Sequence, residues 1–172
     1  MRAAAGTVGP PLGVVVVRDA DAERYAFPDG SEMRLLADGP ATAGQLSVHR
    51  SRLRDGADGA GPHHHTMAAE LFYVLSGSLQ VLVGDDVVVA GTGDVVMVPP
   101  GVTHAFAAAP GHDAELLAIV TPGAARFEFF RRLARVAAGH EPPGPFAHDQ
   151  PSYDVHPDDS PAWREARTGA PR

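Results

Sequence analysis

Short runs of β-branched and aromatic residues, separated by glycine, proline and aspartate, follow one another along the first 120 residues. Such runs between turn residues are typical of β-strands, and their regular spacing is typical of an antiparallel barrel or sandwich. The dipeptide SG at 76–77 and the tripeptide GDD at 84–86 predict tight hairpins. We expect strands at residues 14–17, 32–37, 45–53, 70–75, 79–83, 87–90, 94–98, 104–108 and 115–120.

After residue 122 the pattern changes to a helical period. Phe127, Phe130 and Ala134 fall on one helical face, and Phe129 and Leu133 on another. This predicts an amphipathic helix that packs over the outside or one end of the barrel. A pair between Glu128 and Arg132 and a C-terminal stop at Gly139 are also expected.

The remaining residues are rich in proline and acidic side chains, which predicts an extended tail. One short helix is expected there, with Ser160 as N-cap and Pro161 as its first residue, and Trp163 as an anchor. The pattern divides the chain into an N-terminal arm and strand (1–30), a barrel (31–122), a C-terminal helix (123–140) and the tail (141–172).

The amino-acid composition excludes several classes of ligand and partner. The 172 residues, 44% of them hydrophobic, predict one globular core. The absence of cysteine excludes disulfides and thiolate ligands, and a net charge of −7 without a basic patch argues against nucleic acid as a partner. The N-terminal apolar stretch is interrupted by glycine and proline at residues 9–13, so it predicts no signal peptide, and no run is long enough to span a membrane. We expect a cytoplasmic protein with no membrane partner.

Candidate chemistry lies in the segment PHHHTMAAE. In an extended chain His63 and His65 share one face and His64 lies on the other, so two imidazoles converge. Glu70 begins the next strand and reaches them if that strand pairs antiparallel. His104, which follows a Pro-Pro-Gly turn, offers a fourth ligand. Taken singly, these residues have ordinary explanations: the three histidines at 63–65 as a solvated loop, Glu70 as a charge at a strand edge, and His104 as a histidine in a turn. Together they predict a metal site.

Three imidazoles and one carboxylate suit a divalent first-row transition metal ion, and Fe, Mn, Ni, Cu and Zn all accept such ligands. About two coordination positions stay open for water, dioxygen or a substrate oxygen pair. Phe72 and Val74 share the face of Glu70, and Phe106 shares that of His104, so we expect these three to line a substrate pocket. Apolar walls above a metal suit a small aromatic or enolic substrate.

The other polar residues are expected to have structural roles or to lie on the surface. The histidines without a partner at ligand spacing are His49, His112, His140, His148 and His156. His64 is expected to point outward or to support the ligands from behind. The arginines that alternate at 50, 52 and 54 are either a solvated face or an anion site.

The two histidine segments resemble the motifs of the cupins. G-x5-H-x-H-x3,4-E-x6-G is matched by His63, His65, Glu70 and a glycine at 77, although its first glycine is replaced by Ala57. The second motif, G-x5-P-x-G-x2-H-x3-N, is matched up to His104 but ends in alanine at 108. The resemblance covers about residues 44–121 and implies an all-β cupin fold, a double-stranded β-helix or jelly-roll barrel, here with a C-terminal helix.

The segment TPGAARFEFFRRLA also resembles the C-terminal helix of bacterial flavonol-cleaving cupins. The resemblance implies a metal-dependent oxidoreductase of the quercetin 2,3-dioxygenase type, with Glu70 as catalytic base and dioxygen as a co-substrate. Two alternatives stay open: a metal-dependent isomerase, cyclase or lyase on a polyketide- or sugar-like substrate, and a non-catalytic small-molecule binder. Nothing in the sequence resembles a helix-turn-helix beside the barrel, which argues against a transcriptional regulator. Cupins commonly pair, so a homodimer is expected, with residues 14–17 as an edge strand.

Overall fold

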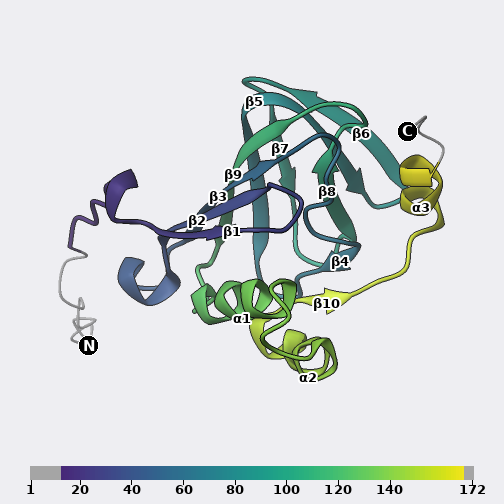
Figure 1. The fold of residues 1–172 in the computed structure, drawn as a ribbon. Coiled ribbons are helices and arrows are strands. Elements are labelled where there is room, and N and C mark those ends of the chain that lie inside the picture. The colour runs from purple at the N-terminus through teal and green to yellow at the C-terminus, as the bar shows by residue number, and fades with distance from the viewer. Residues whose placement is uncertain (1–12, 169–172) are drawn as a thin grey trace, which may run out of the picture.

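The computed structural model describes residues 13–168, in which antiparallel strands roll into a barrel with two helices at one end and a third on its side (Figure 1). The strands are β1 (Glu23–Ala26), β2 (Glu32–Ala37), β3 (Ser47–Leu53), β4 (His63–His64), β5 (Ala69–Val83), β6 (Asp86–Gly91), β7 (Val95–Val98), β8 (His104–Ala108), β9 (Ala114–Thr121) and β10 (His156–Pro157). The helices are α1 (Phe127–Ala137), α2 (Pro143–Asp149) and α3 (Pro161–Thr168), with short 3-10 turns at Asp19–Asp21, Gly39–Thr42 and Gln150–Tyr153.

Strand β5 joins the two halves of the barrel. Its first half pairs with β7 and β9, in a sheet that continues through β3 and β2 to β1. Its second half pairs with β6 and β8, and the sheet continues through β4 to β10. The inward side chains of both halves form the core, with Leu79, Val81 and Leu116 fully buried.

The hairpin expected at residues 76–77 is wrong, because β5 runs through both predicted strands without reversing. The register shifts between Val74 and Ser76, and Gly77 has a φ of +79°. A Cβ at Gly77 would collide with the carbonyl oxygen of Asp113, so only glycine lets the chain pass. The signal that suggested a turn marks the point where one strand bends from one sheet into the other. The hairpin at GDD is confirmed, since Val83 pairs with Asp86.

Other predicted strands are confirmed to within two residues, with one exception. Residues 14–17 form no strand and are exposed, so the predicted edge strand is wrong. Strands β1, β4 and β10 were not predicted. They are short or mostly exposed, and each exists because a neighbouring strand supplies backbone partners, which local sequence does not reveal.

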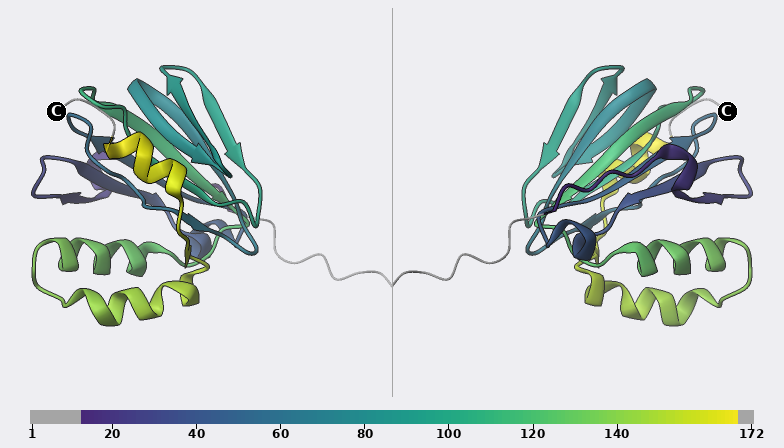
Figure 2. Two further views of the ribbon diagram at one scale, coloured as in Figure 1. Left: turned by 90° about the vertical axis from the view of Figure 1, so that its right-hand side faces the viewer. Right: turned by 90° about the vertical axis from the view of Figure 1, so that its left-hand side faces the viewer.

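Helix α1 lies inside the predicted range, and Gly139, with a φ of +73°, ends it as expected. The predicted pair of Glu128 with Arg132 is wrong. Glu128 binds Arg135 at 2.9 Å, whereas Arg132 binds Glu141 at 2.8 Å, because the chain after the helix folds back along it. Figure 2 shows α1 and α2 as a layer across the end of the barrel.

The tail differs from the extended segment that was expected. Helix α3 is confirmed: Ser160 Oγ accepts the backbone N–H of Trp163, and the buried indole packs against Leu82 and Ala107. Helix α2 and strand β10 are additional. Proline is tolerated in the first turn of α2, and the buried Phe146 packs against Phe129 at a ring-centroid distance of 5.0 Å. Tertiary packing therefore orders a segment whose composition predicts none.

No helix within residues 13–168 is long and apolar enough to cross a membrane.

Candidate metal centre and adjoining cavity

Four predicted side chains, His63, His65, Glu70 and His104, come together inside the barrel. Their ligand atoms lie within 4.8 Å of one another, and each residue is between 1% and 7% exposed. His63 and His104 are direct cross-strand partners on β4 and β8. Glu70 enters from β5, between β7 and β9, and His65 from the end of β4. The antiparallel pairing therefore assembles four residues that are up to 41 positions apart in sequence, from 63 to 104.

Backbone carbonyls fix the orientation of all three imidazoles. The Nδ1 atoms of His63 and His104 lie 2.8 and 2.9 Å from the carbonyl oxygens of Gly61 and Val102, and Nδ1 of His65 contacts that of Asp154. A carbonyl only accepts, so each Nδ1 carries the hydrogen and each Nε2 is left to face the centre.

This arrangement fits a metal ion on physical grounds. Nε2 of His104 lies 2.9 Å, and Nε2 of His65 3.2 Å, from Oε2 of Glu70. Because each Nδ1 already carries its hydrogen, a neutral imidazole would point a lone pair at a carboxylate oxygen. Such a pair of acceptors is stable only with a cation between them, either a second proton or a metal ion. The donor set of three nitrogens and one carboxylate fits a divalent first-row ion.

The electrostatics favour the metal-binding forms of Glu70 and His63. Burial alone would raise the pKa of Glu70, but hydrogen bonds from His104 and His65 hold it well below its usual range. Burial, aided by the charge of His104, lowers the pKa of His63 to about 4. A carboxylate and a neutral imidazole are the forms that coordinate metal. Burial alone would lower the pKa of His104, but the hydrogen bond with Glu70 and its charge raise it, so an ion that binds here displaces a proton from His104.

His64 points away from this centre, as the alternation predicts. Its Nδ1 lies 2.8 Å from Oδ2 of Asp158, which also accepts from the hydroxyl of Thr103, and its ring stacks on His156. Strand β10 thereby holds the back of β4. His112, His140 and His148 are exposed, as expected.

The tail supports the ligands more directly through Asp154, which sequence reasoning missed. Its carboxylate accepts from the backbone N–H and the hydroxyl of Thr66, at 2.8 and 2.6 Å, and from the backbone N–H of Met67 at 3.1 Å. Burial opposes ionisation, but these bonds lower the pKa of Asp154 to about 2. An aspartate in a proline-rich segment carries no local signal for this role.

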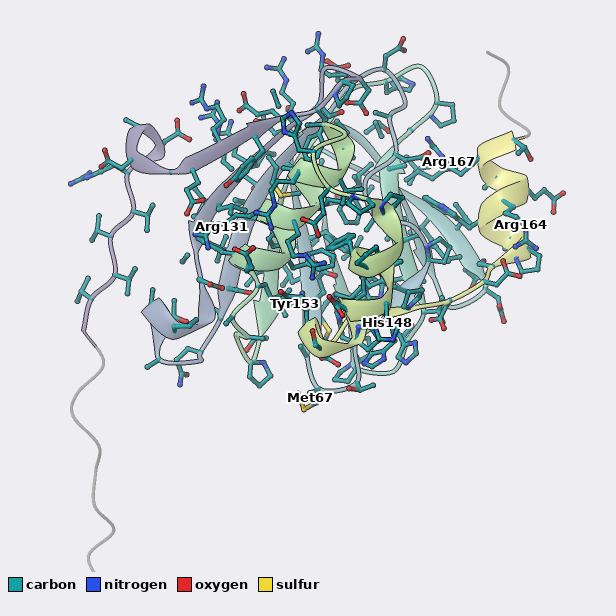
Figure 3. The ribbon with its side chains drawn as sticks, turned by 60° about the horizontal axis from the view of Figure 1, so that its bottom comes forward. Met67, Arg131, His148, Tyr153, Arg164 and Arg167 are labelled. Atoms are coloured by element: carbon teal, nitrogen blue, oxygen red, sulfur yellow. The ribbon has the colours of Figure 1, made fainter. Side chains whose placement is uncertain are left out.

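A cavity of about 710 Å³ adjoins the ligands and lies between the barrel and the helices. Figure 3, which views the molecule from the end that carries the helices, shows α1 lying across that end of the barrel. Of the three residues predicted to line a substrate pocket, Phe106 lies on this cavity. Phe72 and Val74 do not line the cavity. Both are fully buried in the core of the barrel, where other core side chains cover them and Phe72 packs against Phe106. Unpredicted aromatic walls come from Phe27, Phe129, Phe130 and Phe146.

Three buried polar residues on the cavity, His49, Ser51 and Arg126, were also missed. His49 was expected to serve structure or the surface. The alternation of β3, with arginine at 50 and 52 between them, could have indicated that His49 and Ser51 face inward. The outward arginines at 50 and 54 pair with acidic residues, as on a solvated face.

Comparison with known proteins finds the same barrel fold in other chains. A family model for the cupin domain matches residues 49–120. A predicted oxalate decarboxylase from Thermotoga maritima is 26% identical, with a TM-score of 0.53, over 62% of this chain and 97% of that chain. The polyketide cyclase RemF from Streptomyces resistomycificus is 19% identical, with a TM-score of 0.51, over 73% and 98%. A variant of Streptomyces PAC13 with uridine is 17% identical, with a TM-score of 0.53, over 67% and 87%.

No curated protein sequence matches the chain. The strand pairing, the domain match and the solved structures together confirm the cupin fold, an all-β barrel with C-terminal helices. The buried cluster of three histidines and one glutamate fits a cupin metal site.

Proposed function

We propose that this protein is a metal-dependent cupin enzyme that acts on a small enolic or aromatic substrate, with dioxygen as its second reactant. The observation that carries the proposal is the position of Glu70. Its Oε2 faces the imidazoles, whereas no hydrogen bond to Oε1 is found within residues 13–168, and Glu70 also lines the cavity. One residue can thus serve as a ligand and present a free carboxylate oxygen to a substrate.

The ion, held by the three histidines and Glu70, would supply Lewis acidity that lowers the pKa of a substrate hydroxyl. Glu70 Oε1 is the acceptor for the proton that leaves. The side chains of Phe106, Phe129 and Phe130 form apolar walls that hold a planar substrate and exclude water. A cavity of about 710 Å³ has the usual size for a small-molecule site.

Dioxygen as a reactant rests on the complete set of four ligands, on the aromatic cavity and on the resemblance of the helix after the barrel to that of flavonol-cleaving cupins. A second candidate is enolisation without oxygen, as in an isomerase or cyclase. The polar side chains on the cavity favour it, because they could stabilise charge on a substrate that is never oxidised. Streptomyces Pac13, named a nucleoside dehydratase, and the polyketide cyclase RemF share the fold.

The test is oxygen uptake by protein loaded separately with Fe, Mn, Ni, Cu or Zn, against a panel of flavonols, catechols and 1,3-diketones. We expect uptake with at least one pairing, lost in Glu70→Gln and retained in the control His112→Gln, which changes an exposed histidine. Product formation without air would instead support the isomerase or cyclase. Saturable binding with unchanged ligand throughout would contradict both and indicate a binding protein.

A further inference from the structure

Three buried polar side chains on the cavity wall have no role in holding a metal. Arg126 is 4%, His49 5% and Ser51 3% exposed, and all three line the cavity beside His65 and Glu70. Buried polar groups normally have hydrogen-bond partners in the protein. These three are incompletely satisfied, so each indicates an atom that the protein itself does not supply.

Arg126 comes from the residue before α1, where the carboxylate of Asp38 binds its backbone N–H at 2.8 Å. Its Nη2 lies 3.0 and 3.4 Å from the two ring nitrogens of His65. An in-plane approach at these distances would collide with the ring carbon between the nitrogens, and Nδ1 is already engaged by Asp154. The guanidinium therefore lies over the face of the imidazole.

Much of the hydrogen-bonding capacity of Arg126 is unused. Nε and Nη2 reach the carbonyl of Tyr153 at 3.4 and 3.3 Å, and Nη1 donates no hydrogen bond within the described residues. None of the ion pairs within residues 13–168 includes Arg126. Arg132, six residues further along the chain, binds both Glu141 and Asp149, so acidic partners are available to other arginines of this segment.

An unpaired buried guanidinium is costly, because burial removes the water that stabilises its charge. Burial accordingly lowers the pKa of Arg126, opposed by the more distant charges of Glu70, Asp154 and Asp38. Arginine nevertheless stays protonated. Besides Glu70, three carboxylates line the cavity, but each is engaged elsewhere: Glu32 binds Arg34, Asp58 binds Arg167, and Asp29 accepts from the backbone N–H of Ser31. A carboxylate of a bound ligand can therefore supply the ion pair that Arg126 does not form within residues 13–168.

Ser51 and His49 point to the same conclusion independently of charge. Within the described chain, Ser51 Oγ is the buried side-chain polar atom that has no hydrogen-bond partner. His49, two residues earlier on the same inward face of β3, packs against Phe130 at a ring-centroid distance of 4.5 Å and forms no side-chain hydrogen bond found in residues 13–168. A hydroxyl and an imidazole N–H are both donors suited to a carboxylate oxygen.

We propose that Arg126, with His49 and Ser51, forms a carboxylate subsite beside the metal centre, so that the substrate is an enolic or aromatic acid. The inference rests on the proposed function, because it adds a carboxylate to a substrate whose other oxygens reach the metal. Arginine binds a carboxylate through two parallel N–H groups, and a partly desolvated pocket strengthens the bond.

The test is calorimetric binding to the metal-loaded protein of 2,3- and 3,4-dihydroxybenzoate, each compared with its methyl ester. We expect at least one acid to bind at least about tenfold more tightly than its ester, since a hydrogen bond to a charged group contributes that much. Arg126→Gln should abolish this preference while leaving ester affinity and metal content unchanged. Arg126→Lys should keep part of it, and the control Arg131→Gln, on the exposed side of α1, should keep all of it.

Ser51→Ala keeps the test decisive if Arg126→Gln does not fold. It removes a hydroxyl without a partner, so the fold should lose no stability while acid affinity falls several-fold. Equal affinity of wild type for acid and ester, no binding of either, or an Arg126→Gln or Ser51→Ala protein that keeps the full preference would overturn the subsite. A wild-type protein that binds no metal would instead overturn the proposed function.

Discussion

The floor and the cap of the cavity are built in different ways. On the floor, the barrel holds four ligand side chains whose positions follow from strand pairing and from nearby backbone carbonyls, at Gly61 and Val102. The cap consists of Arg126, Phe129 and Phe130, from α1 and the residue before it, and of Phe146 from α2, which reach the site only because the chain folds back over the barrel. We propose that the floor would hold the metal ion and that the cap selects the substrate.

The largest expected effect is a loss of metal affinity when one of the four ligand side chains on the floor is removed. Glu70→Ala or His104→Ala removes a ligand, and metal affinity should fall by more than about a hundredfold, because even residues that only support ligands commonly contribute ten- to a hundredfold. Elemental analysis and chelator competition measure it. His148→Ala, which changes an exposed histidine of the cap, should bind metal normally. Full metal occupancy at unchanged affinity in both ligand variants would contradict the assignment.

A second change tests the wall between floor and cap. Burial lowers the pKa of His49 to about 4, from an ordinary value of 6.5. The unfolded chain therefore binds more protons than the folded one between these values, so the contribution of His49 to stability is complete above pH 6.5 and is lost as the pH falls toward 4. The loss is about 3 kcal/mol.

Urea unfolding of metal-free wild type and His49→Gln at several values between pH 7 and pH 4.5 isolates the contribution of His49 to the free energy of unfolding. The stability of wild type relative to the variant should fall as the solution is acidified. A difference that is constant with pH would mean that the His49 imidazole is accessible enough to titrate normally.

The smallest effect concerns the link from cap to floor. Asp154→Asn keeps the size of the side chain but replaces one acceptor oxygen by a donor, so a hydrogen bond with Thr66 or Met67 is lost. We expect about 2 kcal/mol less stability at pH 7, and metal affinity lower by up to about tenfold because His65 loses support. The difference should shrink below pH 3.8 as the native carboxyl, whose pKa is about 2, approaches protonation. Thermal unfolding with and without metal measures both quantities.

How much the sequence predicted depended on the range of the interactions. Alternation placed His63 and His65 together and His64 apart, and the helix stop at Gly139 was equally local. Gly77 shows the limit of prediction from local sequence. Glycine is found both in hairpin turns and where a strand bends, and only the position of Gly77 against the backbone of Asp113 shows that it is a bend. Phe72 was placed on the correct face of its strand, yet at a depth where core side chains cover it.

The sequence by itself determined the barrel, the four converging ligands and the helix after it, because hydrophobic period, turn residues and ligand spacing are written within short segments. Tertiary structure alone decided that the cavity carries an arginine that forms no ion pair within residues 13–168, and that the tail is bonded to Thr66 and Met67 beside the metal centre. Contacts between Asp154 and Thr66, or Arg126 and His65, join residues more than sixty positions apart. No local pattern encodes such contacts, since they exist only once the chain has closed on itself.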